Sequence, residues 1–390
     1  MNNIKVVHVV TVSKSVKLME GQLEYLQQQG FNVTVISSPG PELEEVSKKK
    51  INVKPIKIER EIKLISDIFS LINLIVYFRK NKPHLTNVST PKAGLLGGLA
   101  AFISGVPCRI YTMRGLRFET TSGIKRIILK LMEKISCFLA HQVICISPSL
   151  KEKALELGIV SERKVIVLGH GSSNGLDINK FPTRASIENQ EEILKFRKQL
   201  GIPLDSPVMG FVGRLTRDKG IEELIKAFKI VKKDIKDLRL LIVGDFEEGD
   251  PVSDATKKEI NHNKHIYKLG FLKNPIPYYY IMDVFVFPTH REGFGNVSIE
   301  AAAAELPVVT TDATGAIDTV MDNVTGFVVP VGDYNKMADK ISFILKQPSI
   351  GRKMGKEGRK RVIEKFRSEI IWGELYNLYS KIIKENLKLK

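Results

Sequence analysis

The chain has 390 residues, of which 43% are apolar, and its mean hydropathy is −0.05, which is typical of a soluble two-domain protein and argues against a disordered or membrane-spanning one. Its three cysteines, Cys108, Cys137 and Cys145, lie in apolar stretches without a C-x-x-C pair, so we expect reduced thiols in a cytosolic protein and no cysteine metal site. Residues 1–12 are too short and polar for a signal peptide, and no apolar run reaches the roughly 20 residues of a spanning helix.

Positive charge is concentrated in the first half of the chain. The net charge is +17, and residues 1–180 hold 26 lysines and arginines against 14 aspartates and glutamates. A basic surface attracts nucleic acids or anionic lipid headgroups. The alternative is a lysine-rich composition without any partner. Nucleic acid is disfavoured because aromatic residues make up only 7% of the chain and no nucleic-acid-binding motif is present.

The first half alternates strands and helices, beginning with a strand–helix–strand unit whose helix is closed by Gly30. The predicted elements, in chain order, are strand 4–12, helix 16–29, strand 32–37, helix 61–80, strand 85–90, a small-residue helix from residue 91, strand 108–113, helix 124–139, strand 143–147, helix 148–157 and strand 164–168. Helices 61–80 and 124–139 set large apolar residues beside lysines and arginines. We expect core packing to account for most of 61–80, whereas 124–139 could lie on a membrane or simply cover a sheet.

Two loops of the first half contain candidate binding residues. Arg114 and Gly115 follow the carboxyl end of a strand, where the guanidinium could hold a phosphate or sugar oxygen or pair locally with Glu119. His170 lies in a glycine-rich turn and is either a binding residue or an ordinary loop residue.

Residues 183–206 are polar and predict a linker and a lead-in helix, after which the alternation restarts. The elements predicted in the second half are strands 208–213, 238–245, 266–270, 284–287, 308–312 and 327–330, with helices at 221–232 and 298–304. Alternation at this spacing is typical of a parallel, doubly wound sheet, so we predict an α/β chain with two such sheets.

Arg214 and Lys219 lie five residues apart on a loop that follows a predicted strand. Both side chains could therefore bind one diphosphate, because two cations stabilise the negative charge that grows on such a group as it leaves. Solvated loop charges are the alternative.

Residues 290–304 place two carboxylates eight positions apart across a loop-to-helix junction. Glu292 follows a short buried strand that Pro288 ends, and Glu300 lies in the first turns of an alanine-rich helix. In an open α/β sheet, ligands bind outside the carboxyl ends of the strands, and the free N–H groups of a helix start favour phosphate. A nucleotide fits this description.

These stretches resemble motifs of the retaining glycosyltransferases of family 4. The similar motifs are E-x7-E at 292–300, G-R-x-x-x-x-K-G at 213–220, P-K-A-G-x-x-G at 91–97, N-G-x-D-x-x-x-F at 174–181 and a glycine-bearing loop at 312–316. The chain departs from the family pattern twice: Arg114 stands where many relatives have histidine, and the loop 13–15 lacks the usual pair of glycines.

The resemblance implies the GT-B fold, with two Rossmann-like doubly wound domains facing a central cleft. The domains would be an acceptor-binding domain at 1–182, a nucleotide-sugar-binding domain at 183–365, and a helix at 366–390 that returns to the first domain. The catalytic residues would be Glu292, which binds hydroxyls of the donor sugar, and Arg214 and Lys219, which neutralise the diphosphate. The other donor-binding residues would be Glu300, on the ribose hydroxyls, with Gly213, Gly293, Phe294, Gly295, Asn296, Val297 and Gly315; the acceptor residues would be Lys92, Arg114, Gly115 and His170.

The resemblance also implies a reaction. A hexose, N-acetylhexosamine by similarity to bacterial relatives, would pass from a UDP-sugar to a hydroxyl of a polyprenyl-diphosphate-linked saccharide, with retention, in surface glycan or glycoprotein synthesis. We expect no cofactor beyond this co-substrate and no metal, because no Asp-x-Asp motif adjoins a nucleotide-binding strand. The alternatives are a UDP-sugar 2-epimerase of the same architecture and a nucleic-acid-binding protein. The basic first half predicts a cytoplasmic protein held peripherally on the anionic inner face of the cell membrane.

Overall fold

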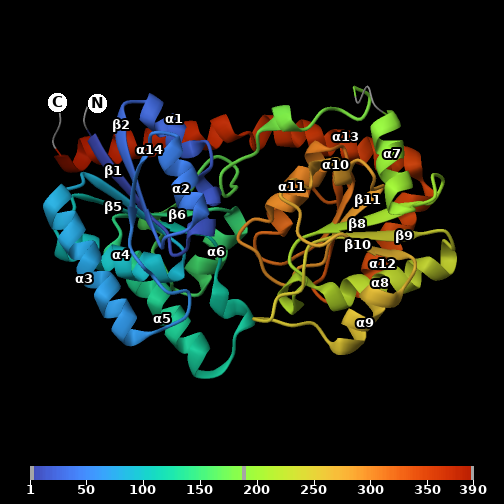
Figure 1. The fold of residues 1–390 in the computed structure, drawn as a ribbon, viewed down its shortest axis with the longest axis horizontal. Helices are drawn as coiled ribbons and strands as arrows, with labels where there is room; N and C mark the ends of the chain where they lie inside the picture. Colours follow the sequence, from blue (N-terminus) through green and yellow to red (C-terminus); the bar gives the residue numbers. More distant parts are fainter. Residues whose placement is uncertain (1–3, 187–189, 388–390) are drawn as a thin grey trace. The chain divides into compact units, whose positions relative to one another are not determined.

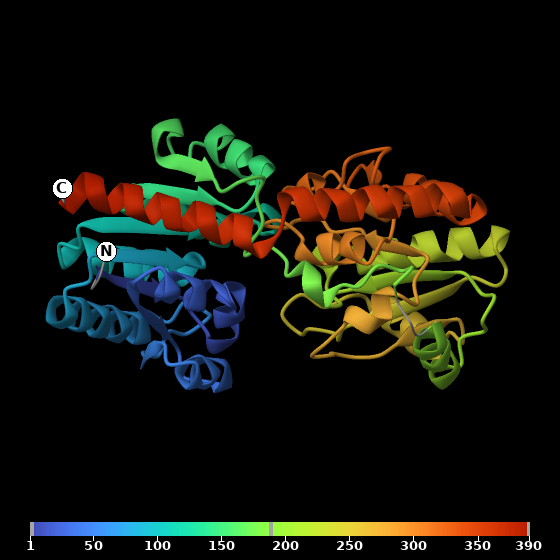
Figure 2. The ribbon, with the colours of Figure 1, turned by 90° about the horizontal axis from the view of Figure 1, so that it is seen from above.

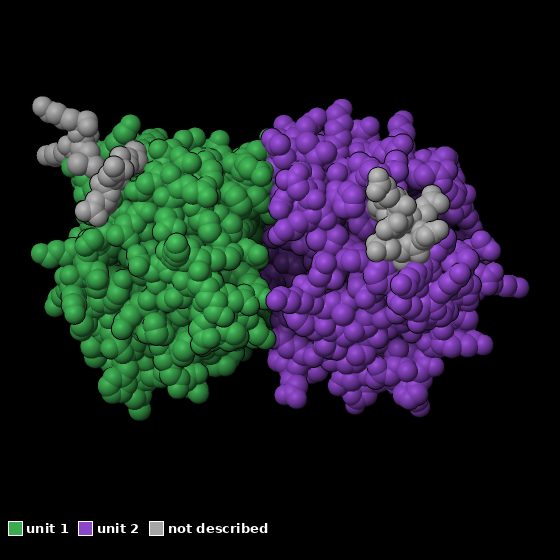
Figure 3. Space-filling model, turned by 45° about the horizontal axis from the view of Figure 1, so that its top comes forward, with its two compact units in different colours: residues 1–175, 368–390 green, residues 176–367 purple. Residues whose placement is uncertain are grey.

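The computed structural model describes residues 4–186 and 190–387. The chain divides into two compact units: unit 1 combines residues 1–175 with 368–390, and unit 2 comprises 176–367 (Figure 3). Residues 187–189 of the predicted linker lie outside the described residues, and helix α7 (Gln190–Leu200) follows them.

Unit 1 is built on a seven-stranded parallel sheet with the strand order β3-β2-β1-β4-β5-β6-β7. Its strands are β1 (Ile4–Val9), β2 (Phe31–Ser37), β3 (Asn52–Pro55), β4 (Leu85–Ser89), β5 (Cys108–Met113), β6 (Gln142–Cys145) and β7 (Val165–Val167). Valine, isoleucine and leucine dominate the central strands because helices cover both faces of the sheet.

The helices of unit 1 lie on both faces of this sheet (Figures 1 and 2). They are α1 (Gln22–Gln28), α2 (Pro41–Lys48), α3 (Leu64–Asn81), α4 (Pro91–Ile103), α5 (Gly123–Leu139), α6 (Pro148–Glu156) and α14 (Ser368–Leu387). The predicted helix 16–29 is instead a 3-10 stretch followed by α1, because Gly21 between them has a φ of +77° that a helix cannot accommodate. Helix α14 contributes Leu375 and Tyr379 to the same buried core as β1 and β2.

Unit 2 repeats the arrangement with a six-stranded parallel sheet in the order β10-β9-β8-β11-β12-β13, so the predicted α/β class with two doubly wound sheets is confirmed. Its strands are β8 (Val208–Val212), β9 (Arg239–Val243), β10 (Ile266–Lys268), β11 (Val284–Phe287), β12 (Val308–Thr311) and β13 (Gly326–Val329). Its remaining helices are α8 (Ile221–Asp234), α9 (Asp254–His262), α10 (Ile276–Tyr279), α11 (Asn296–Ala303), α12 (Tyr334–Lys346) and α13 (Pro348–Lys365).

The outward side of α3 carries a row of large apolar side chains, which we call the α3 stripe. Its members, each 50–75% exposed, are Leu64, Ile65, Ile68, Phe69, Ile72 and Val76. The expectation that core packing accounts for most of this segment is therefore wrong. Helix α4 packs against α3, and the buried residues of α3 are Ser70, Leu74 and Phe78.

Helix α5 has a second row of this kind, the α5 stripe. Its members, 41–76% exposed, are Ile124, Ile127, Ile128, Leu131 and Phe138. The opposite side of α5 is buried and holds Glu133 and Cys137, and all three cysteines of the chain are free and buried, as predicted.

Glu133 makes the stability of unit 1 depend on pH. Its side chain is buried and accepts a hydrogen bond of 2.6 Å from the Tyr111 hydroxyl at Oε2. Burial raises the pKa of Glu133 from 4.5 to about 7, although the Tyr111 hydrogen bond opposes the shift. Between these two values the unfolded chain releases a proton that the folded chain retains. Stability is therefore full below about pH 4.5 and falls, by up to about 3 kcal/mol, as the pH rises to about 7.

Glu133→Gln is accordingly expected to raise the free energy of unfolding at pH 8 and to change it little at pH 4.5. Urea titrations monitored by tryptophan fluorescence report on unit 1 alone, because Trp372 on α14 is the one tryptophan of the chain. Equal changes in the free energy of unfolding at both pH values would show that folding does not raise the pKa of Glu133.

Candidate functional site

The candidate site in unit 2 lies at the carboxyl ends of its strands. Strand β8 pairs with β9 on one side and with β11 on the other, so the direction of winding reverses between β8 and β11. Loops after these two strands leave toward opposite faces of the sheet, which opens the position where doubly wound sheets bind ligands. Arg214 and Lys219 follow β8, and Glu292 follows β11.

Two glycines allow the loops of this edge to touch. Gly220 has a φ of +68°, and a Cβ there would lie 1.9 Å from the Pro288 carbonyl oxygen. Gly315 has a φ of +78°, and a Cβ there would lie 2.5–2.6 Å from the carbonyl group of Gly293. A side chain at either position would push these loops apart. The two glycines therefore allow the backbones of the loops to come into contact at the site.

Lys219 and Glu292 form an ion pair across the switch point. Lys219 is 9% exposed, and its ammonium lies 5.8 Å from the centre of the Phe287 ring. The backbone N–H of Glu292 donates a 3.0 Å hydrogen bond to the Thr314 carbonyl, which holds the glutamate against the loop after β12. Sequence reasoning placed both residues at one site without predicting this direct pairing.

A second ion pair lies beside the first and was not predicted. Arg291 Nη2 is 3.0 Å from Asp218 Oδ2, and the hydroxyl of Thr216 donates to Asp218 Oδ1 at 2.5 Å. Burial works to raise the pKa of Asp218, but Lys219, Thr216 and Arg291 outweigh burial and hold that pKa below its usual value. The cation Lys219 is therefore next to a stably ionised carboxylate, and Arg291 fixes the orientation of that carboxylate.

Arg214 is half-exposed and pairs with Glu247, on the loop after β9. Burial alone would lower the pKa of Arg214, yet the hydrogen bond and charge of Glu247 raise it. Arg214 also feels the charge of Glu292, which places it in the same electrostatic environment as Lys219. Glu247 itself was missed, because nothing in the sequence links positions 33 residues apart on different loops.

Glu300 lies within α11 and accepts a 2.8 Å hydrogen bond from the Tyr279 hydroxyl. Burial raises the pKa of Glu300, and the Tyr279 hydrogen bond only partly offsets this effect. Tyr279, fully buried on α10, is a positioning residue that sequence reasoning did not find.

The predicted donor-binding stretch between the two glutamates is mostly buried. Gly295, with a φ of +85°, caps the start of α11, and Phe294 packs edge-on against Phe366 at 5.2 Å. The Phe294 side chain is thus part of the core of unit 2. Asn296 Oδ1 and Ser298 Oγ, at the start of the helix, are buried with no hydrogen-bond partner. Unpaired polar atoms at this position are suited to a polar ligand.

The four residues predicted for the acceptor belong to unit 1 and lie on α4, on the loop after β5 and on the loop after β7. Arg114 donates to the carbonyl and hydroxyl of Ser173, and burial lowers its pKa to about 10. Gly115 follows with a φ of +128°. Lys92 is buried and lies 2.6 Å from Asp67, so it ties α4 to α3. His170 is an exposed residue of the loop after β7.

Arg114 lines a small hollow of about 20 Å³ under the carboxyl ends of β1, β4 and β5. His8, also in this hollow, is buried, and burial with the nearby Arg114 charge lowers its pKa from 6.5 to about 3. His8 is therefore neutral at physiological pH, and Arg114 carries the positive charge of this hollow.

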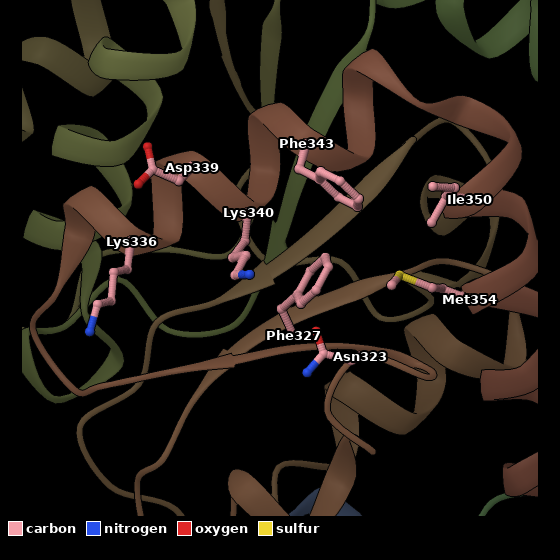
Figure 4. A pocket seen from close by; sticks show the side chains of 8 residues that line it. All are labelled: Asn323, Phe327, Lys336, Asp339, Lys340, Phe343, Ile350 and Met354. Carbon is pink, nitrogen blue, oxygen red and sulfur yellow. The ribbon is translucent and has the colours of Figure 1, made fainter.

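A larger hollow, of about 680 Å³, opens elsewhere on unit 2, between β13, α12 and α13 (Figure 4). The side chains around it are Asn323, Phe327, Lys336, Asp339, Lys340, Phe343, Ile350 and Met354. The Lys340 ammonium lies 4.5 Å from the centre of the Phe327 ring. No residue predicted for the donor or the acceptor lines this hollow.

Within residues 4–186 and 190–387, no three histidine, cysteine, aspartate or glutamate side chains come together in a group that could hold a metal ion. The charged groups described at the switch point are instead paired cations and carboxylates.

Comparison with known proteins agrees with this geometry. Residues 192–361 match the family model of the glycosyl transferases group 1, and residues 3–147 match that of glycosyl transferase 4-like proteins. The sequence is 46% identical over 386 residues, 99% of both chains, to the capsular polysaccharide biosynthesis glycosyltransferase CapM of Staphylococcus aureus. It is 29% identical to the UDP-Gal:alpha-D-GlcNAc-diphosphoundecaprenol alpha-1,3-galactosyltransferase of Escherichia coli, over 72% of this chain and 71% of that one.

The fold is similar to the crystal structure of Anabaena Alr3699/HepE in complex with UDP-glucose, with a TM-score of 0.80 and 20% identity over 97% of this chain and 99% of that chain. At this identity the likeness concerns the fold alone, whereas the sequence match to CapM extends over nearly the whole length of both chains. The chain therefore belongs to the glycosyltransferases of family 4, which have the GT-B fold.

Proposed function

We propose that this glycosyltransferase moves a sugar, an N-acetylhexosamine, from a UDP-linked donor to a hydroxyl of a polyprenyl-diphosphate-linked saccharide, with retention, in the synthesis of a bacterial surface polysaccharide. The observation that carries the proposal is the ion pair between buried Lys219 and half-buried Glu292 at the switch point of unit 2. It sets a cation for the diphosphate beside a carboxylate for the sugar hydroxyls.

Each charged group of the site has a distinct role in this proposal. Lys219 and Arg214 neutralise the charge that develops on the diphosphate as the sugar leaves. Glu292 accepts hydrogen bonds from the donor sugar, and Glu300, oriented by Tyr279, accepts them from the ribose hydroxyls. The unpaired oxygens Asn296 Oδ1 and Ser298 Oγ are in the first turn of the helix that carries Glu300, and we propose that they bind further polar atoms of the donor.

Retention follows from the order of events at the leaving group. The bond between the sugar and the diphosphate oxygen breaks, and that oxygen takes the proton of the acceptor hydroxyl on the same face of the sugar. The new glycosidic bond then forms on the face that the diphosphate left. No protein base is needed, and two cations do the work of a metal, so we propose that the reaction requires neither a metal nor a cofactor.

Two relatives of known role support the substrates. CapM belongs to capsular polysaccharide synthesis, and the Escherichia coli relative uses a UDP-sugar with a diphosphoundecaprenol-linked acceptor. The N-acetylhexosamine assignment rests on the similarity of the stretches 293–303 and 314–320 to enzymes that extend such acceptors.

A panel of UDP-sugars tests the proposal. With a synthetic polyprenyl-diphosphate N-acetylhexosamine as acceptor, mass spectrometry should detect an added N-acetylhexosamine, and NMR should show the anomeric configuration of the donor in the product. Chelation with EDTA should leave the rate unchanged. Product of inverted configuration, or loss of activity that added Mg²⁺ restores, would contradict the mechanism, and transfer only from a donor without UDP would contradict the donor.

We further propose that the enzyme works in the cytoplasm, peripherally on the anionic inner face of the cell membrane, where a lipid-linked acceptor resides. Among the residues that the structure describes, none of the helices is both long and apolar enough to cross a bilayer. The excess of 26 basic over 14 acidic residues in 1–180 provides the electrostatic attraction.

A further inference from the structure

We infer, on the basis of the proposed lipid-linked acceptor, that the α3 and α5 stripes of unit 1 insert together into the headgroup region of an anionic bilayer. Contact between apolar side chains and lipid, rather than charge alone, then holds the enzyme on the membrane. This attachment resists salt.

Each of the two helices has two apolar sides, of which only one is buried in unit 1. In α5, Leu129, Met132 and Ser136 recur every three to four residues and are buried. Ile124, Ile127 and Ile128 follow the same period but lie on the other side of the helix, 41–76% exposed. Helix α3 is organised in the same way, with Leu74 buried and Ile65 and Ile72 exposed. A second apolar side exposed to water indicates that a second apolar partner covers it.

The two stripes belong to one surface. Helix α4 packs against both α3 and α5, and the three helices lie on the same face of the unit 1 sheet (Figures 1 and 2). The end of α4 adds Phe102 and Ile103, which are 53% and 44% exposed. Exposed large apolar side chains therefore occur on all three of these neighbouring helices, whereas single scattered ones are normal on a soluble protein.

Charge on the same helices decides between a lipid surface and a protein partner. Lys125, Arg126 and Lys134 of α5 are exposed, while its one acidic residue, Glu133, is buried. On α3 the one acidic residue, Asp67, is paired with Lys92. The surface thus exposes cations beside apolar residues and no unpaired carboxylate on either helix. A second copy of this chain would bring like charges together, whereas an anionic leaflet matches both the charge and the apolar character.

The effect of salt on vesicle binding distinguishes insertion of apolar side chains from electrostatic adsorption. Headgroup attraction is screened at high ionic strength, because the Debye length falls to about 3 Å at 1 M salt. Burial of apolar side chains in the acyl boundary is not screened. The full chain is therefore expected to remain on vesicles of phosphatidylglycerol and phosphatidylethanolamine in molar salt, although charge still assists the first encounter.

Co-sedimentation of the full chain with these vesicles, without donor or acceptor, tests the inference. Ile68→Glu combined with Ile127→Glu should weaken binding at least about tenfold at both low and molar salt, because each large apolar side chain contributes more than the 1.4 kcal/mol that corresponds to tenfold. The matched control is Phe271→Glu, at an apolar residue of unit 2 that is 77% exposed, which should bind as the wild type does. Replacement of Lys125 and Lys134 by glutamine should weaken binding at low salt and leave the binding at molar salt unchanged.

Three outcomes would overturn the inference: release of the wild type by molar salt, unchanged vesicle binding of the double variant, or a wild-type dimer in solution that the double variant dissociates, which would assign the surface to a second copy. Both substituted side chains are exposed, so the fold is expected to persist, and an unchanged urea midpoint of Trp372 fluorescence, which reports on unit 1, would verify it. Vesicle binding involves no sugar transfer. An enzyme that binds vesicles but transfers nothing would refute the proposed function and leave the inference standing.

Discussion

Lys219→Met is expected to reduce turnover with a UDP-sugar by about a hundredfold to a thousandfold, the usual effect of removing one group that stabilises charge in the transition state. The substitution keeps most of the volume of the side chain beside Phe287 but removes the ammonium that pairs with Glu292. Affinity for plain uridine should change little, because the charge that Lys219 meets lies on the diphosphate and grows as the sugar leaves. Single-turnover rates and calorimetry with uridine measure the two quantities separately.

A matched control for this change is Lys233→Met, at an exposed residue in the last turn of α8, the end of the helix that is far from the site. It should leave turnover at the wild-type value. Lys219→Arg, which keeps the charge, should restore part of the lost rate. Equal losses for uridine binding and for sugar transfer would instead mean that Lys219→Met disrupts the loop after β8, and a change of turnover below tenfold would remove Lys219 from the catalytic set.

Glu300→Ala is expected to weaken UDP binding by about a hundredfold or more. Two hydrogen bonds from ribose hydroxyls to a carboxylate contribute roughly 1.5–3 kcal/mol each. The raised pKa of Glu300 gives this interaction a pH dependence. The ionised form is lost as the pH falls through that raised value, so UDP affinity should begin to fall at a higher pH than it would for an ordinary glutamate.

Two variants separate the charge of Glu300 from its position. Glu300→Gln keeps the shape of the side chain and should remove the pH dependence together with most of the affinity. Tyr279→Phe removes the 2.8 Å hydrogen bond to Glu300 while the carboxylate remains, so its effect should be several-fold smaller. Unchanged UDP affinity in folded Glu300→Ala, measured by calorimetry, would exclude the ribose role.

Much of the fold could be predicted because strands and helices have local periods. The alternation of apolar strands and helices identified two parallel sheets, and Pro288 marked the end of β11. Lys219 and Glu292 could be assigned to one site for the same reason, because each follows a strand whose apolar pattern is clear in the sequence. Their side-chain partners could not be predicted, because the contacts of Glu247 with Arg214 and of Tyr279 with Glu300 depend on how loops from different strands meet.

Helix α3 shows the limit of periodicity more sharply. Apolar residues surround most of this helix, and a pattern of that kind does not reveal which side faces the protein. Only the packing of α3 in the folded unit shows that Leu74 and Phe78 are the buried ones. The error in assigning this segment to the core therefore comes from tertiary packing, which one sequence does not contain.

The place of α14 in the chain has a consequence for biosynthesis. This helix is made after all of unit 2, yet its Leu375, Tyr379 and Ile383 belong to the core of unit 1. On the ribosome, residues 176–367 can complete their own core as they emerge. The first 175 residues, in contrast, keep an apolar face exposed until α14 has been synthesised. Nascent chains that stall before residue 368 therefore present to chaperones and proteases an unfinished unit 1 beside a finished unit 2.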